Sequence, residues 1–171
     1  GHHRRQRQMC IRDRIIIIIE MGTFSKKIFI LLPTLICSFE LLSEVHTVKM
    51  LNQGSTGIMV FEPAVLKINV GDTVTFEATD AAHNSASIPG MLPPNASNWN
   101  GQLSRDISVT FDIPGIYGYQ CTPHAMMAMV GIIQVGNDYS NLQSVKNVAT
   151  QFKTTFVMNQ TRLDDYLLQL N

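Results

Sequence analysis

The chain has 171 residues, of which 45% are hydrophobic and 15% are charged, and its 13 basic side chains balance its 13 acidic ones. This length fits one globular domain of ordinary size and leaves no room for a second. Beyond the first residues there is no basic stripe and no alternation of basic with aromatic residues, so nucleic acid is excluded as an expected partner.

Residues 1–20 differ in composition from everything that follows. GHHRRQRQMCIRDR carries five arginines without apolar periodicity, and it runs directly into IIIII. We interpret this segment as an artefact, a tag remnant or a disordered basic arm. It is excluded from the prediction of the fold.

Residues 21–45 have the layout of a secretory signal peptide. Lys26 and Lys27 form a short basic region, and IFILLPTLIC then supplies an apolar run that is too short to span a bilayer. We therefore expect cleavage near Ser43–Val45, a periplasmic location and a mature domain, residues 46–171, that does not insert into the membrane. That domain has six basic and nine acidic side chains, a net charge of −3.

Short alternating segments predict β-strands over most of residues 46–136. Val74 and Phe76 alternate with polar residues in DTVTFEA, and Ile107, Val109 and Phe111 do so in DISVTFDI. VHTVKML, VLKINV, IYGYQC and MVGIIQV continue the series, and NQGSTG, VGD and IPGIYG supply turn signals. This pattern indicates an all-β domain built as an antiparallel sandwich or barrel.

The hydrophobic period changes after Gly136. Apolar residues recur at three- and four-residue steps in NLQSVKNVATQF and again in TRLDDYLLQL, which predicts two amphipathic helices. Thr161 followed by Asp164 predicts a capping box at the start of the second helix. Residues 137–171 are therefore expected to form a helical C-terminal extension that covers part of the sandwich of residues 46–136.

The loop CTPHAMMAM, residues 121–129, concentrates the reactive side chains of the expected mature domain. Cys121, His124 and Met129 offer a thiolate, an imidazole and a thioether from one turn between two strands. Cys121 has no internal partner for a disulfide, so a metal-binding role is one explanation of an exported thiol. His83, which follows a predicted strand, is the candidate for a fourth ligand.

Two histidines, one cysteine and a weak axial methionine are the ligand set of a blue-copper electron-transfer site. The soft thiolate and thioether favour copper over hard cations, and structural zinc sites prefer a strong fourth ligand. A single cysteine or histidine is more often a buried or hydrogen-bonded residue, but the joint spacing favours a metal site. We predict one type 1 copper ion, cycling between Cu(I) and Cu(II), on His83, Cys121, His124 and Met129.

From about Val45 to its C-terminus the chain resembles the pseudoazurins, which are small periplasmic blue-copper proteins. KMLNQG, GIMVFEPAVLKINVGDTVTFEATDAAHNSASI, PGIYGYQCTPHAMMAMVGIIQVG and the two terminal helices occur in the order of that family. The C-x2-H-x4-M loop is shared with plastocyanins, whereas MVFEPA and the helical C-terminus favour pseudoazurin. The resemblance implies a Greek-key cupredoxin β-sandwich of about eight strands with two C-terminal α-helices.

The resemblance also implies roles for residues around the ligands. Asn84 matches a residue that ties the ligand loops together and donates a backbone hydrogen bond toward the cysteine sulfur, which tunes the metal. Met59 matches a position that packs near the loop histidine. The ring edge of His124 is expected at the surface, inside an apolar docking patch formed by Pro123, Ala125, Met126 and Met127.

The implied function is outer-sphere transfer of single electrons by a monomer that is not an enzyme. The partners of the family are copper nitrite reductase and c-type cytochromes, which suggests a shuttle in denitrification. Pseudoazurins usually surround the patch with lysines, but Gln53, Ala81, Asn100 and Gln120 stand at or near those positions here. Electrostatic steering of partners is therefore expected to be weak or reversed.

Two other functions fit parts of the pattern. A copper chaperone or storage protein would use the same cysteine, histidines and methionines, with Met126, Met127 and Met129 as a thioether-rich Cu(I) site. An enzyme would use Cys121 as nucleophile and His124 as base, but no orienting Asp or Asn follows nearby. Retention of copper during redox cycling, and an assay for acyl transfer, separate these functions from the electron carrier.

Overall fold

The structure, a computed structural model, describes residues 43–170. The predictions for residues 1–20 and for almost all of the signal peptide therefore lie outside the described residues. The strands are β1 (Val45–Gly54), β2 (Gly57–Glu62), β3 (Val65–Ile68), β4 (Thr73–Glu77), β5 (Ala86–Ser87), β6 (Ile107–Thr110), β7 (Gly115–Gln120) and β8 (Val130–Val135). The helical elements are η1 (Thr122–Met127), α1 (Leu142–Phe152), η2 (Lys153–Thr155), α2 (Arg162–Leu167) and η3 (Leu168–Leu170).

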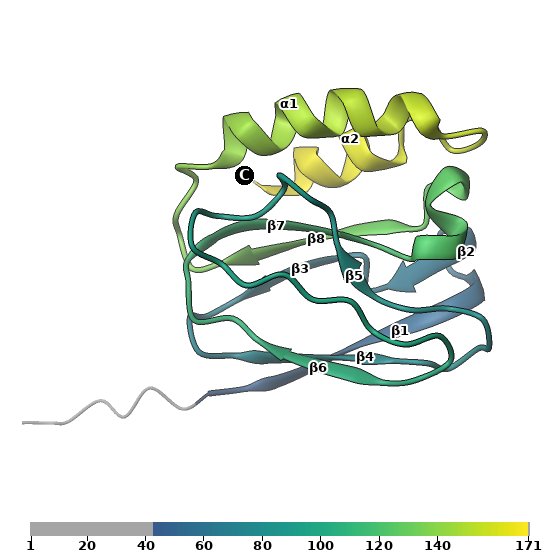
Figure 1. Ribbon diagram of the computed structural model, residues 1–171, viewed down its shortest axis with the longest axis horizontal. Coiled ribbons are helices and arrows are strands. Elements are labelled where there is room, and N and C mark those ends of the chain that lie inside the picture. The colour runs from purple at the N-terminus through teal and green to yellow at the C-terminus, as the bar shows by residue number, and fades with distance from the viewer. Residues whose placement is uncertain (1–42, 171) are drawn as a thin grey trace, which may run out of the picture. The chain divides into compact units, whose positions relative to one another are not determined.

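The strands form two four-stranded sheets that face each other (Figure 1). One sheet has the order β2-β1-β4-β6 and the other β3-β8-β7-β5. Each sheet contains one parallel pair, β1 with β4 and β3 with β8, and its other pairs are antiparallel. The parallel pairs come from connections that cross between the sheets. The all-β sandwich predicted from the sequence is confirmed, together with its two C-terminal helices.

The core between the sheets is built from the alternating residues of both. Val74 and Phe76 of β4 are completely buried, as their alternation with threonines predicts. They belong to a cluster with aromatic residues packed edge to face, among them Phe61 and Tyr119, whose ring centroids lie 4.7 Å apart. Cys121 and Met129 are members of the same cluster. Two of the predicted ligands therefore lie at the margin of a tightly packed apolar core.

A second apolar layer separates β7 and β8 from the C-terminal helices, which lie along the outer face of that sheet (Figure 1). Val145 and Ala149 of α1 and Leu163 of α2 face this layer. The side chain of Asn141, just before α1, donates to the carbonyl of Ile116 and accepts from the amide of Ile116. It thereby satisfies both backbone groups of Ile116 in β7. β8 is buried on both faces as a result, which explains why its sequence is apolar except for Gln134.

Three local features differ from the sequence-based predictions. Strands β2 and β5 were not expected, because β2 contains Met59 with a φ of 50° and β5 has only two residues, so neither shows clean alternation. The predicted capping box is wrong: the Thr161 hydroxyl makes no capping hydrogen bond to the backbone and donates instead to the carboxylate of Asp165 at 3.1 Å.

No helix among residues 43–170 is long and apolar enough to span a membrane.

Candidate metal centre

The four predicted ligands come from two segments that the fold brings together at one end of the sandwich. His83 lies in the connection between β4 and β5. Cys121 follows β7 directly and is the N-terminal cap of η1, His124 lies within η1, and Met129 stands just before β8. Because β7 and β8 are antiparallel neighbours, the loop between them is anchored at both ends, and the amide of Cys121 donates to the carbonyl of Met129 at 2.9 Å.

The donor atoms of three of these residues form a small triangle. The Nδ1 atoms of His83 and His124 lie 3.1 Å apart, and the Cys121 sulfur lies 3.6 Å from the first and 3.4 Å from the second. The centre of such a triangle is about 2 Å from each corner, which is close to the bond length from a first-row metal ion to an imidazole nitrogen or a thiolate. Two imidazoles and one thiolate therefore fit a copper ion in both chemistry and spacing.

Met129 is completely buried and shares the core cluster with Cys121. Its amide donates to the carbonyl of His124 at 3.2 Å, so its backbone is bonded to both other ligands of the loop. A thioether is a soft and weak donor, so Met129 would suit the fourth place in the predicted ligand set. The structure thus brings all four residues predicted from the sequence into one region.

The orientation of the His83 ring depends on a residue that the sequence did not single out. Nε2 of His83 lies 3.0 Å from Oδ1 of Asn52 in β1. Since an amide oxygen can only accept, Nε2 carries the proton and Nδ1 keeps its lone pair for a metal. This contact could not be predicted from the sequence, because Asn52 and His83 are 31 positions apart and become neighbours only through the β1–β4 pairing.

Burial determines the protonation of the site in the absence of metal. Desolvation, together with the neighbouring His124, lowers the pKa of His83, whereas Asp80 acts weakly in the opposite direction. Burial raises the pKa of the Cys121 thiol, against hydrogen bonds from the backbone at Asn84 and His124 that lower it. His83 is therefore neutral and ready to coordinate at neutral pH. Cys121 must release its proton when a metal binds.

Asn84 joins the two ligand segments. Its side-chain oxygen accepts from the amide of Thr122 at 2.8 Å, and its side-chain nitrogen donates to the Thr122 hydroxyl at 3.1 Å and the Gly101 carbonyl at 3.0 Å. Its backbone also bonds the Cys121 sulfur. These contacts match the role that the sequence resemblance implies for it. Met59 is half-buried against the core cluster that contains two of the ligands, and its influence on His124 stays a prediction.

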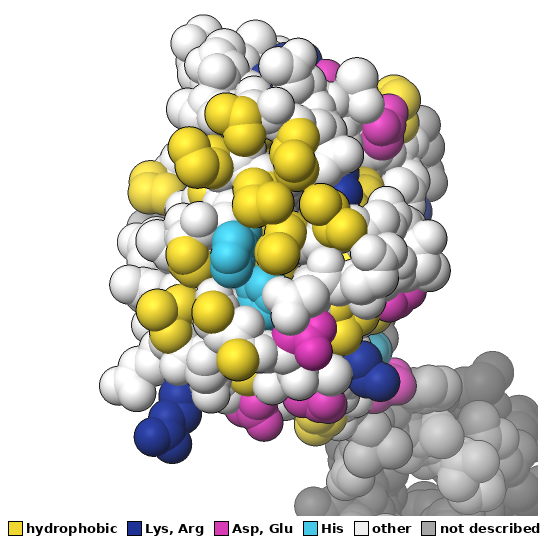
Figure 2. Space-filling model, turned by 90° about the vertical axis from the view of Figure 1, so that its right-hand side faces the viewer, with side chains coloured by type: hydrophobic (Ala, Val, Ile, Leu, Met, Phe, Trp, Pro, Cys, Tyr) yellow, Lys and Arg dark blue, Asp and Glu magenta, His cyan; other side chains and the backbone are white. Residues whose placement is uncertain are grey.

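The loop presents apolar side chains on the outer surface of the site. Met126 is 54% exposed and Pro123 is exposed, whereas Ala125, Met127 and His124 are half-buried. Figure 2 shows histidine atoms visible among hydrophobic side chains at the centre of this face. The charged side chain nearest to the histidines at the centre of this face is acidic (Figure 2). Gln53, Ala81 and Asn100 are exposed, and Gln120 is half-buried.

Comparisons with known proteins agree with this geometry. A family model of copper-binding proteins, the plastocyanin/azurin family, matches residues 48–136. A pseudoazurin of Paracoccus pantotrophus is 38% identical over 126 residues, which cover 74% of this chain and 83% of the relative. The crystal structure of pseudoazurin from Methylobacterium extorquens AM1 superposes with a TM-score of 0.69 at 38% identity, covering 74% of this chain and 99% of that one. Native pseudoazurin from Hyphomicrobium denitrificans gives a TM-score of 0.66 at 32% identity, covering 73% and 97%.

Proposed function

The chain belongs to the pseudoazurins within the copper-binding plastocyanin/azurin family, and on this premise we propose that His83, Cys121, His124 and Met129 hold the copper of a periplasmic electron shuttle. Its cofactor is copper, and it is a blue-copper electron-transfer protein. The observation that carries the ligand assignment is the triangle of two Nδ1 atoms and one sulfur with sides of 3.1, 3.4 and 3.6 Å.

Copper supplies one-electron chemistry at this site, between its Cu(I) and Cu(II) states. The protein holds the donor atoms in place: His83 and Cys121 are completely buried, and Asn84 and Asn52 fix the segments that carry them. Because these residues are buried and held in place, the ligand set would change little between the two oxidation states, which would lower the reorganisation energy of electron transfer. Their burial also excludes an exogenous substrate from the metal, in keeping with a carrier rather than an enzyme.

His124 provides the route to the surface, because its ring is only half-buried and is surrounded by Pro123, Ala125, Met126 and Met127. These side chains form the docking patch of the proposal. An apolar patch of this kind loses little hydration on contact, which suits partners that bind briefly and leave quickly. We assign copper nitrite reductase as acceptor and a c-type cytochrome as a second partner, with the protein acting as a monomer in the periplasm in denitrification.

Two features of the site disfavour the alternatives. A copper chaperone must expose ligands that can be exchanged, but three of these ligands are completely buried, and the most exposed thioether of the loop belongs to Met126, which is not one of them. An enzyme that uses Cys121 as nucleophile needs its thiolate, whereas burial raises the pKa of this thiol and so favours the protonated form.

Redox cycling in the presence of a Cu(I) chelator separates a carrier from a chaperone. The copper-loaded protein is reduced and reoxidised repeatedly while the chelator competes for the metal. We expect the protein to keep its copper and to reduce copper nitrite reductase in each cycle. Transfer of most of the copper to the chelator within a few cycles would instead support a chaperone or storage protein.

The location is tested by expressing the gene with its full N-terminal segment and separating the periplasm from the cytoplasm. The proposal expects copper-loaded protein in the periplasmic fraction, beginning near residue 46. Full-length protein confined to the cytoplasm would contradict it.

A further inference from the structure

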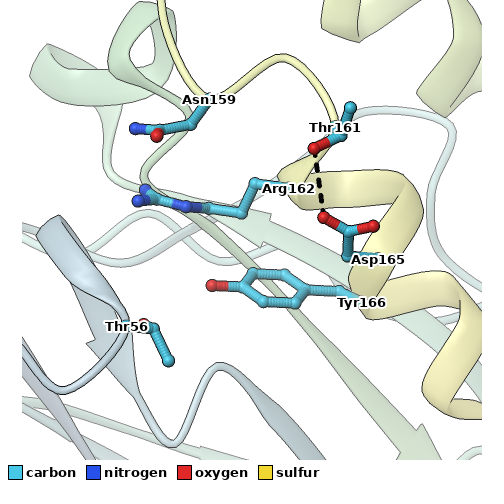
Figure 3. A pocket seen from close by; sticks show the side chains of 6 residues that line it. All are labelled: Thr56, Asn159, Thr161, Arg162, Asp165 and Tyr166. Atoms are coloured by element: carbon cyan, nitrogen blue, oxygen red, sulfur yellow. Dashed lines mark hydrogen bonds between the residues drawn. The ribbon is translucent and has the colours of Figure 1, made fainter.

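A buried arginine of the C-terminal extension lies against the loop that carries three of the four proposed ligands. Arg162, the first residue of α2, is only 8% exposed. Figure 3 shows its side chain extending from the helix beside Asn159, along the wall of an open pocket of about 240 Å³. Burial of a guanidinium is unfavourable unless its donors are satisfied, so its partners indicate why it lies there.

Those partners are backbone carbonyls on two different segments. Nη1 of Arg162 donates to the carbonyls of Met59 and Ala128, both at 3.0 Å, and Nη2 donates to the carbonyl of Ile58 at 3.3 Å. Hydrogen bonds from a charged donor are stronger than neutral ones, and the planar fork of arginine can hold several acceptors at once. Arg162 therefore links β2 to the end of the ligand loop.

Both acceptors of Nη1 have a left-handed backbone. Met59 has a φ of 50° and Ala128 a φ of 60°, and neither is glycine. Such conformations are unfavourable for residues with a side chain and persist where the surroundings hold them. Ala128 immediately precedes the proposed ligand Met129. The neighbours of Met59 in β2 pair with the residues of β1 on either side of Asn52, the residue that orients His83.

The segment that leads to Arg162 holds the two preceding carbonyls of the loop as well. The amide of Val157 donates to the carbonyl of Met126 at 2.8 Å, and Nδ2 of Asn159 donates to the carbonyl of Met127 at 3.4 Å. Residues 157–162 thus donate hydrogen bonds to three successive carbonyls at the end of η1. The last carbonyls of a helix have no partner within the helix, so these bonds satisfy them. These residues lie beyond the segment that the family model matches, which ends at residue 136.

We propose that Arg162 is a positioning residue for the copper site. By fixing the backbone of Ala128 and Met59, it sets the position of Met129 relative to the metal and thereby the electronic character of the site. This inference rests on the proposed ligands. Its consequence is that the electronic character of the site depends on a residue of the C-terminal extension that touches neither the metal nor a ligand side chain.

The test compares Arg162→Gln and Arg162→Lys with a matched control, Lys153→Met. Lys153 also contacts α2, through its ion pair with Asp164, but that pair lies on the solvent side of the extension. In the Cu(II) proteins we expect both Arg162 variants to change the ratio of the two thiolate-to-copper absorption bands and the anisotropy of the electron paramagnetic resonance spectrum. The spectra of Lys153→Met should superpose on those of the wild type. Wild-type spectra from a cooperatively folded Arg162→Gln or Arg162→Lys protein would overturn the proposal.

A second measurement uses the metal-free protein and does not depend on copper. Amide hydrogen exchange at Ala128 and Met129 should accelerate at least about tenfold in Arg162→Lys, because the loop then opens without global unfolding. Exchange at Ile132 in β8 should stay unchanged. Unchanged exchange at Ala128 and Met129 would overturn the positioning role. If the wild type takes up no copper, the proposed function fails, whereas this exchange experiment still decides whether Arg162 holds the loop.

Discussion

At the scale of single residues, the site depends on hydrogen bonds that fix the ligand rings as much as on the ligands themselves. Asn52 is the clearest case, because its side-chain oxygen selects the tautomer of His83 and leaves Nδ1 free for the metal. Asn52 is exposed at the surface, so its side chain contributes little to the core. Its substitution therefore probes the metal site with little disturbance of the fold.

Replacing Asn52 with leucine should weaken copper binding by roughly 10- to 100-fold, the usual effect of losing a residue that orients a metal-bound histidine. Competition titration with a chelator of known affinity measures this change. Gln53→Ala is the matched control, since Gln53 is the exposed neighbour and its side chain donates to the carbonyl of Gly54, away from His83. Equal affinities of the two variants would show that the contact to Asn52 does not orient His83.

Gly131 illustrates a residue required by close packing. A Cβ at this position would lie 2.2 Å from Cζ of Tyr119 and 2.6 Å from the carbonyl oxygen of Ala64. Neither atom can move easily, because Tyr119 is completely buried and its hydroxyl donates to that same carbonyl. Because Gly131 has no side chain, β8 leaves room for the ring of Tyr119 in the core.

Gly131→Ala should lower the free energy of unfolding by about 3 kcal/mol or more, because overpacking a rigid core forces the surrounding side chains to shift. Urea denaturation of the metal-free protein measures it. In the control, Gly71→Ala, a Cβ meets nothing within 4 Å and only the left-handed φ of 91° opposes the change. The expected loss there is about 1 kcal/mol. A loss at Gly131 no larger than at Gly71 would contradict the packing argument.

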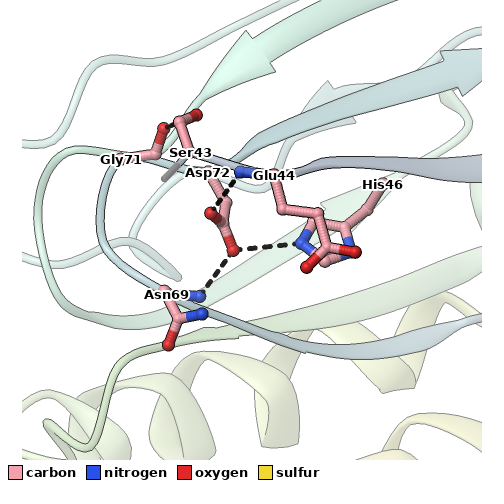
Figure 4. A network of polar contacts seen from close by, with 6 residues as sticks. All are labelled: Ser43, Glu44, His46, Asn69, Gly71 and Asp72. Carbon is pink, nitrogen blue, oxygen red and sulfur yellow. Dashed lines mark hydrogen bonds and ion pairs between the residues drawn. The ribbon is translucent and has the colours of Figure 1, made fainter. Parts of the chain in front are cut away.

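At the scale of secondary-structure elements, a buried carboxylate fastens the start of β1 to the turn before β4. Asp72 is 1% exposed; its Oδ1 accepts from the amide of Glu44 and its Oδ2 from the amide of Asn69, each at 2.8 Å. Oδ2 also lies 3.0 Å from Nε2 of His46 (Figure 4). Burial alone raises the pKa of this carboxyl, but these hydrogen bonds outweigh it and hold the pKa below its ordinary value.

The sign of the pH effect follows from that lowered pKa. The carboxylate stabilises the fold fully above its unfolded pKa of about 3.9, and this contribution is lost as the pH falls through the lower folded pKa. Asp72→Asn should therefore lower the free energy of unfolding by about 2 kcal/mol at neutral pH, and the difference from the wild type should shrink below about pH 4.

Urea denaturation of the metal-free proteins between neutral and acidic pH measures this difference. Asp112→Asn, a change at an exposed aspartate, should have little effect throughout that range. A difference between Asp72→Asn and the wild type that stays constant into strong acid would rule out the network as its source.

The elements also show what a sequence can and cannot predict. Alternation identified the strands around Val74 and Ile107, and the change of period identified α1 and α2, because these patterns reflect which face of an element is buried. β2 was missed since the left-handed Met59 interrupts it. The proposed ligands were identified from their types and spacing, whereas Asn52 and Arg162 were not, since their contacts join residues 31 and 34 or more positions apart.

At the scale of the whole molecule, charge determines how partners approach. The described residues around the docking patch include Asp80, which is close enough to influence the pKa of His83, and the four positions expected to carry lysines in relatives are Gln53, Ala81, Asn100 and Gln120. Long-range attraction toward an acidic partner is therefore weak, and apolar contact at Met126 and its neighbours must supply most of the binding.

The rate of electron transfer to a partner should consequently depend little on salt. We expect the association rate measured by stopped-flow to change less than about threefold between low and moderate ionic strength, because opposite charges do not meet across the interface. Introducing lysines at Gln53 and Ala81 should make the reaction with an acidic partner faster and more sensitive to salt. A steep fall in the wild-type rate with added salt would contradict this account.

The central claim is that His83, Cys121 and His124 bind copper through the triangle of donor atoms seen in the structure. Adding Cu(II) to the purified domain, with Cys121→Ser as control, tests it most directly by visible and electron paramagnetic resonance spectroscopy. The account predicts an intense thiolate-to-copper band and the narrow copper hyperfine splitting of a type 1 site, both absent from Cys121→Ser. A wild-type protein that stays colourless with Cu(II), or that takes up only zinc, would contradict it.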